Sequence, residues 1–180
     1  MEIESIRLRL AEITWEDLEN IHVLHSIPEV DAFNTLGLPK NIEETREVIR
    51  PIIKELGSAR REHISWKIET KDTLEFIGLA GMVFSAEKYK QAEIYYKFLP
   101  PHWGKGYATE VSKALINFGF NEFNLHIVGA GVATKNTQSI KVLEKSGMTR
   151  EGLRRRVLPI RGKWVDNYEY AILEDDPRDY

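Results

Sequence analysis

The chain has 180 residues, of which 25 are basic and 28 acidic, so its net charge of -3 gives no reason to expect a nucleic-acid ligand. It contains no cysteine, which excludes a disulfide framework, a thiolate zinc site and a cysteine nucleophile. The first residues lack the order of a signal peptide, and the longest apolar run, residues 76–84, is too short to span a bilayer. We therefore expect one cytoplasmic domain over residues 1–180, with no membrane contact and no direct binding of nucleic acid.

The first half of the chain predicts alternating strands and helices. Apolar and charged residues that alternate with period two indicate half-buried strands, and apolar residues three or four apart indicate helices. Pro51 interrupts the second predicted helix, where we expect a kink or a restart. In chain order we predict a strand over residues 5–11, a helix to about His25 that begins at a capping box of Thr14 and Asp17, a loop over residues 27–40, a helix over residues 42–56 capped by Asn41, and an antiparallel hairpin of strands 63–70 and 74–84.

The second half predicts a parallel strand–helix–strand unit followed by a hairpin. Gly147 is the expected stop of its second helix. Together with the first half, these elements indicate a mixed, mostly antiparallel twisted sheet with helices on both faces and a parallel βαβ core, an α/β fold. The predicted elements are a strand over residues 92–98, an amphipathic helix that ends near Phe120, a strand over residues 125–132, a helix over residues 137–145, and a hairpin of residues 150–158 and 164–173.

Gly104 and Gly106 stand immediately before the amphipathic helix. The first amides of a helix have no partner within it, and the aligned peptide dipoles place partial positive charge there. Glycine lets a ligand approach the backbone closely. This loop is therefore expected to bind a phosphate or pyrophosphate.

Two other glycine motifs for nucleotides fit less well. Residues 129–134 have the spacing of a dinucleotide-binding fingerprint, but Thr134 stands where the third glycine is needed. The loop at residues 104–106 is not a Walker P-loop, because the required earlier glycine is missing and glycine follows Lys105 in place of serine or threonine. Neither pattern accounts for the chain.

A third pattern extends over nearly the whole chain. Its pieces occur in one order between matching elements, and together they resemble the GNAT superfamily of acyl-coenzyme A-dependent N-acyltransferases. The terminal hairpin makes them most similar to the branch that acetylates the N-terminal alanine or serine of ribosomal proteins. The pieces are AEIYY at 92–96, WGKGYATE at 103–110, NxxS at 136–139 and VLEKSG at 142–147, followed by Glu151-Gly152, Arg154, Trp164, Asp166 and YAIL at 170–173.

The resemblance implies a set of site residues. Glu93 is the candidate base, on the strand that leads into the glycine loop, and Ser139 or a water held by Asn136 is the candidate proton donor. Leu143 stands where many relatives have a tyrosine acid. The residues expected to contact coenzyme A are Phe98, Leu99, Trp103, Gly104, Lys105, Gly106, Tyr107, Ala108, Thr109, Asn136 and Ser139, with Trp103 packed under the loop.

Acetyl transfer to an amine needs a neutral amine, a polarised thioester carbonyl and a proton for the departing thiolate. An α-amino group, with a reference pKa of about 7.7 to 8.0, is deprotonated far more easily than lysine at about 10.4. Glu110 is also close to the loop, where it could orient a ligand or complement the helix dipole.

The resemblance thus implies transfer of an acetyl group from acetyl-CoA, without a metal, to a primary amine, most readily the N-terminal α-amino group of a ribosomal or other protein. One alternative is acetylation of a small amine such as a polyamine, an amino acid or an aminoglycoside. Another is a coenzyme A-binding sensor without turnover, suggested by the missing tyrosine. We expect a monomer or a homodimer.

Overall fold

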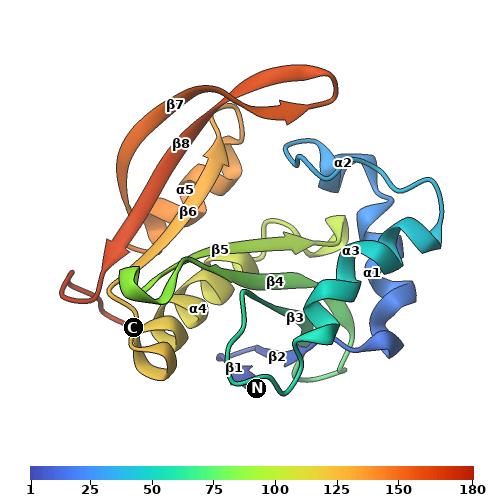
Figure 1. Cartoon of the computed structure of the whole chain (residues 1–180), viewed down its shortest axis with the longest axis horizontal. Coiled ribbons are helices and arrows are strands. Elements are labelled where there is room, and N and C mark those ends of the chain that lie inside the picture. The colour runs from blue at the N-terminus through green and yellow to red at the C-terminus, as the bar shows by residue number, and fades with distance from the viewer.

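One eight-stranded sheet runs through the computed structural model, which describes residues 1–180 (Figure 1). The strand order is β1-β2-β3-β4-β5-β6-β8-β7, and every neighbouring pair is antiparallel except the parallel pair β5 and β6. The predicted mixed, mostly antiparallel sheet is therefore confirmed. The strands are β1 (Glu2–Glu4), β2 (Leu8–Glu12), β3 (His63–Thr70), β4 (Phe76–Phe84), β5 (Gln91–Phe98), β6 (Ile127–Ala133), β7 (Thr149–Ile160) and β8 (Lys163–Leu173).

Helices cover both faces of the sheet. On one face α4 (Tyr107–Phe123) and α5 (Thr137–Lys145) bury apolar side chains such as Leu115 in the larger core. On the other face lie α1 (Leu18–His25), α2 (Pro28–Asp31) and α3 (Ile42–Lys54), which form a smaller core against β4 (Figure 1). None of the helices has both the length and the apolar content needed to cross a membrane.

The parallel unit β5–α4–β6 and the hairpin β7–β8 form as predicted. The glycines of the rejected dinucleotide motif, Gly129 and Gly131, lie within β6 and pair with β8. Their amides therefore belong to the sheet, and no helix begins at this motif. The predicted capping box is also present, because the Thr14 amide donates to an Asp17 carboxylate oxygen at 2.9 Å, but it caps a 3-10 turn, Trp15–Asp17, that leads into α1.

Three local predictions differ from the structure. The strand expected over residues 5–11 begins in a turn at residues 5–7, so Ile6 is 90% exposed and β2 begins at Leu8. The predicted loop contains the one-turn helix α2, which begins at Pro28. Helix α3 continues through Pro51, which is exposed, so water can solvate the carbonyl that a proline leaves without a partner.

Candidate active site

The sheet opens between its two parallel strands. β5 and β6 pair over only three residues, with Glu93 opposite Gly129 as the last pair, and then diverge (Figure 1). A cavity of about 1060 Å³ lies at this opening and is lined by both strands, by α5, by the start of α4, by the segment from α2 to Thr35, and by β7 and β8. Both faces of β5 contribute, because Tyr95 and Tyr96 point to opposite sides and each lines the cavity. The cavity therefore connects the two faces of the sheet.

The glycine loop and the first turn of α4 form one end of this cavity. Gly104 and Gly106 have φ angles of +73° and +81°, a conformation that side chains with a Cβ rarely adopt. No side chain caps the first turn of α4, whose residues Tyr107, Ala108 and Thr109 line the cavity. These free amides and the close approach to the backbone fit a pyrophosphate group.

His102 adds a second observation at the same end. Its Nδ1 atom is buried and has no hydrogen-bond partner, while its Nε2 atom lies 3.3 Å from a Glu75 carboxylate oxygen. The ring also lines the cavity. A buried polar atom without a partner is costly, and the protein supplies no partner to this one. The glycine loop and the free amides of α4 are the features of this end that fit coenzyme A.

The loop is fastened to the turn between β1 and β2. Glu110 accepts hydrogen bonds from the Ser5 hydroxyl at 2.7 Å, the Arg7 amide at 2.7 Å and the Arg7 Nε atom at 2.8 Å. Arg7 also donates to the Lys105 carbonyl at 3.0 Å. Burial acts to raise the pKa of Glu110, but these hydrogen bonds outweigh it and lower the pKa below its usual value. The sequence offered no signal that links Arg7 to the loop.

Some of the residues predicted to contact coenzyme A line the cavity and others do not. Trp103 donates from Nε1 to the Phe98 carbonyl at 2.7 Å, and its ring is 48% exposed at the cavity, not packed under the loop as expected. Leu99 packs into the smaller core, and Lys105 accepts from Arg7 through its carbonyl. Neither lines the cavity. The predicted residues that do are Phe98, Trp103, Gly104, Gly106, Tyr107, Ala108, Thr109, Asn136 and Ser139.

The start of α5 brings a hydroxyl pair to the cavity. The Asn136 side chain caps the helix by accepting from the Ser139 amide at 3.2 Å. The Ser139 hydroxyl shares a hydrogen bond of 2.7 Å with the Tyr96 hydroxyl. Burial raises the pKa of Tyr96 to about 12, against the smaller opposing effect of Ser139. The sequence analysis did not identify Tyr96 as a site residue. Leu143, which the resemblance aligns with a tyrosine of many relatives, is buried in the core.

A different set of side chains lies on the α1–α3 face. Glu93, Tyr95 and Lys97 project there from β5, and Asn167 and Glu169 project there from β8. Between the two strands, from Gly129 onward, β6 presents only Gly129, Gly131 and Ala133 to this face. A Cβ at position 131 would lie 3.1 Å from the Asn167 Nδ2 atom, so glycine leaves room for that amide.

The groups on this face differ in their partners. Glu93 is exposed, whereas the Glu169 carboxylate accepts from Asn167 at 2.7 Å and lies 3.6 Å from the Arg154 guanidinium. Burial lowers the pKa of Lys97, and Asp31 acts in the opposite direction. Of the two glutamates that β5 and β8 present on this face, Glu93 is thus the one without a cationic partner.

Hydrogen bonds hold the Tyr95 side chain in one position on the same face. Its hydroxyl shares a hydrogen bond of 2.8 Å with His63 Nε2 and donates to the Ser65 hydroxyl at 3.0 Å. The ring lies over Gly81, where a Cβ would come within 2.3 Å of it. Burial raises the pKa of Tyr95 to about 12, so its hydroxyl stays protonated.

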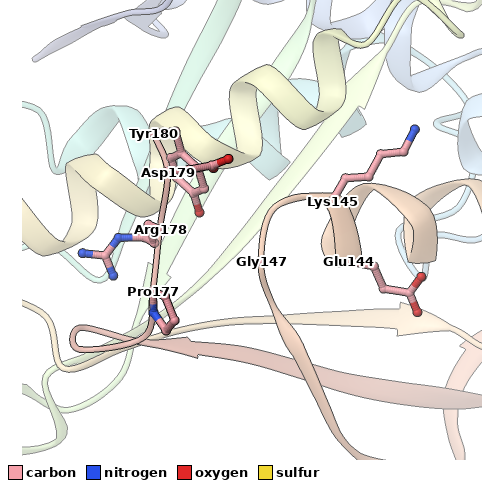
Figure 2. A pocket seen from close by; sticks show the side chains of 7 residues that line it. All are labelled: Glu144, Lys145, Gly147, Pro177, Arg178, Asp179 and Tyr180. Atoms are coloured by element: carbon pink, nitrogen blue, oxygen red, sulfur yellow. The ribbon is translucent and has the colours of Figure 1, made fainter.

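A second hollow of about 320 Å³ lies between the end of α5 and the C-terminal residues (Figure 2). Tyr180 donates to the Ser146 carbonyl at 2.6 Å and so holds the C-terminal segment against α5. None of the predicted site residues lines this hollow, which shares only Lys145 with the cavity. The chain contains no group of three or more His, Asp or Glu side chains arranged to hold a metal ion.

Comparisons with known proteins find similarity along nearly the whole chain. The family model described as "Acetyltransferase (GNAT) domain" matches residues 7–149. The "Uncharacterized N-acetyltransferase YnaD" of Bacillus subtilis is 42% identical over 176 residues, which cover 98% of this chain and 99% of that protein. The spermidine N(1)-acetyltransferase of Escherichia coli is 28% identical over 174 residues, 94% of this chain and 87% of that protein. A crystal structure of a GNAT-family acetyltransferase from Bacillus anthracis has a TM-score of 0.84 and 30% identity, covering 97% of this chain and 99% of that chain.

Proposed function

We propose that this chain, which belongs to the GNAT acetyltransferase family and is an N-acetyltransferase, acts on the N-terminal α-amino group of a protein, as in the ribosomal-protein type. Members of the family take their acetyl group from acetyl-CoA. The observation that carries the proposal is Glu93, an exposed carboxylate without a cationic partner at the point where β5 and β6 diverge.

Each residue group then has one task. The amides of the glycine loop and of the first turn of α4 bind the pyrophosphate, while acetyl-CoA supplies the activated acetyl group. Glu93 accepts a proton from the acceptor ammonium, directly or through one water. Tyr96 and Ser139 stay protonated and donate a hydrogen bond toward the sulfur, where negative charge develops as the thiolate leaves.

The α-amino acceptor is favoured by the free energy of deprotonation. An amine with the reference pKa of lysine costs about 3.5 kcal/mol more to deprotonate than an α-amine. Glu93 is a carboxylate, a weak base for such an amine. Lys97 and Arg154 also line the cavity on the acceptor side, and they would repel a polycation.

Spermidine is the second candidate acceptor. Its support is the similarity to the spermidine N(1)-acetyltransferase of Escherichia coli. Glu29, Glu93 and Glu169 line the cavity and would bind ammonium groups. The two candidates therefore depend on different charges in the cavity. Spermidine would be bound by the glutamates, whereas Lys97 and Arg154 would repel it and favour a peptide.

The test is release of free coenzyme A thiol from acetyl-CoA with N-terminal peptides and with spermidine. The proposal expects a higher kcat/KM for peptides. Replacing Glu93 by glutamine should lower kcat by about 100-fold, within the range of general base catalysis, and leave the coenzyme dissociation constant unchanged. The control is Glu151→Gln, an exposed strand carboxylate outside the cavity. Turnover of spermidine alone, or full activity of Glu93→Gln, would overturn the proposal.

A further inference from the structure

The hairpin β7–β8 carries a concentration of positive charge in a chain whose net charge is -3. Residues 154–166 include one carboxylate, Asp166, and five exposed cationic side chains. The cationic residues are Arg154, Arg155, Arg156, Arg161 and Lys163.

Most of this charge has no partner within the protein. Arg154 is 3.6 Å from Glu169, and the Asp166 carboxylate accepts from the Arg156 main-chain amide at 2.7 Å. The guanidinium groups of Arg155 and Arg156 form no ion pair, and neither does Lys163. Exposed cations without partners stabilise the fold little, so folding does not explain their number.

A β-bulge presents two of these arginines. The register between β7 and β8 shifts between Arg154 and Leu158, so residues 155–157 oppose Asp166 alone. Arg156 has a φ angle of +48°, which is uncommon for a residue with a side chain. Bulges of this kind redirect side chains and are frequent beside active sites.

The hairpin lies at the acceptor side of the cavity. Arg154, Val157 and Leu158 line it opposite the segment that follows α2. The turn of the hairpin reaches toward α2, where Arg161 donates to the Pro28 carbonyl at 2.6 Å (Figure 1). The acceptor side of the cavity is therefore bounded by the hairpin and by the segment that follows α2.

We propose that the hairpin binds acidic side chains close to the acceptor amine, so that the preferred substrates are protein N termini with Asp or Glu at positions two to four. This inference rests on the proposed function. An extended chain advances about 3.3 Å per residue, so these positions lie within about 10 to 13 Å of the reacting amine. Opposite charge at that distance raises the association rate and the affinity, whereas a polyamine is repelled.

The test compares two peptides with the same N-terminal alanine, one with acidic residues and one with lysines at positions two to four. We expect kcat/KM to be about five- to tenfold higher for the acidic peptide at low salt, as two or three exposed ion pairs would give. The preference should shrink in 0.5 M NaCl, where the charges are screened.

The double variant Arg155→Glu/Arg156→Glu should lose or invert this preference and leave turnover of a neutral peptide unchanged. The matched control is Lys54→Glu/Arg60→Glu, which changes net charge equally at two exposed cations away from the cavity. If the glutamate variant does not fold, Arg155→Gln/Arg156→Gln serves in its place, with loss of the preference expected.

The outcomes separate the two proposals. Equal kcat/KM for both peptides would overturn the hairpin inference alone, while absence of peptide turnover beside turnover of spermidine would overturn the proposed function. Stronger inhibition by a short RNA than by the acidic peptide, lost in the arginine variants, would assign the hairpin to nucleic acid and also overturn the inference.

Discussion

The two ends of the cavity are built in different ways. The donor end, formed by the glycine loop and the first turn of α4, comes from one continuous stretch, residues 103–109. The acceptor end comes from α2, β5, β6 and the β7–β8 hairpin, and its contact between Arg161 and Pro28 joins residues 133 positions apart. A ligand common to a whole family can thus be bound by local backbone geometry, whereas acceptor choice depends on side chains that distant segments bring together.

The two ends also differ in what holds them. Hydrogen bonds from Ser5 and Arg7 to Glu110 fix the donor end, and the groups that we propose bind the ligand there are main-chain amides. At the acceptor end the groups are side chains, several of them charged and exposed. Substitution of single side chains should therefore alter the acceptor end readily, while the donor end should respond mainly to changes of backbone conformation.

The largest expected effect comes from breaking the donor end at Gly106. Gly106→Val places a β-branched residue at a φ of +81° with its Cβ 3.5 Å from the Arg7 guanidinium, so the loop amides must move. We expect coenzyme A to bind about 100-fold more weakly by calorimetry. Gly37→Val is the control, because Gly37 has a φ of +79° and nothing near its Cβ. Equal loss of affinity in both variants would contradict the proposed loop role.

A smaller effect is expected where the two ends meet, at Tyr96 and Ser139. Tyr96→Phe and Ser139→Ala should each lower kcat about tenfold, and the double variant should lose little more, because the pair acts through one hydrogen bond. With a pKa of about 12, Tyr96 stays protonated below pH 10 and should give kcat no alkaline limb in that range. Multiplicative losses in the double variant would show that the two hydroxyls act independently.

The smallest effect is expected at Glu110, whose hydrogen bonds hold the donor end in place. Glu110→Gln should raise the coenzyme dissociation constant about threefold and lower Tm by about 3 °C at pH 7, as loss of a charge-assisted hydrogen bond predicts. The folded-state pKa of Glu110 is depressed, so its stabilisation is present above the unfolded value and is lost as pH falls through the folded value.

The Tm difference between wild type and Glu110→Gln should therefore begin to shrink as pH falls through about 4, near the reference pKa of glutamate, and close below the depressed folded-state pKa. Glu122→Gln is the control, because Glu122 is exposed on the same helix and has no partner. A Tm difference that persists unchanged at pH 3 would show that the carboxylate charge is not what stabilises the loop.

Features that depend on neighbouring residues were predictable from the sequence. The capping box of Thr14 and Asp17, the cap at Asn136 and the strand–loop–helix at Gly104 and Gly106 each depend on spacing within a few residues. Local patterns gave a wrong prediction where a turn interrupts them. The alternation of apolar and charged residues that starts at Ile6 predicted a strand, but a turn separates β1 from β2 there.

The sequence by itself determined the order of the elements, the fold and the glycine loop before α4, because hydrophobic periodicity, caps and glycines act over short distances along the chain. Only the tertiary structure decided that Tyr96 meets Ser139, that Arg7 meets Glu110, and that Arg154 of the hairpin lines the cavity. These contacts join residues that lie from tens to more than a hundred positions apart. No local pattern encodes them, since strand pairing and packing bring such residues together only in the folded chain.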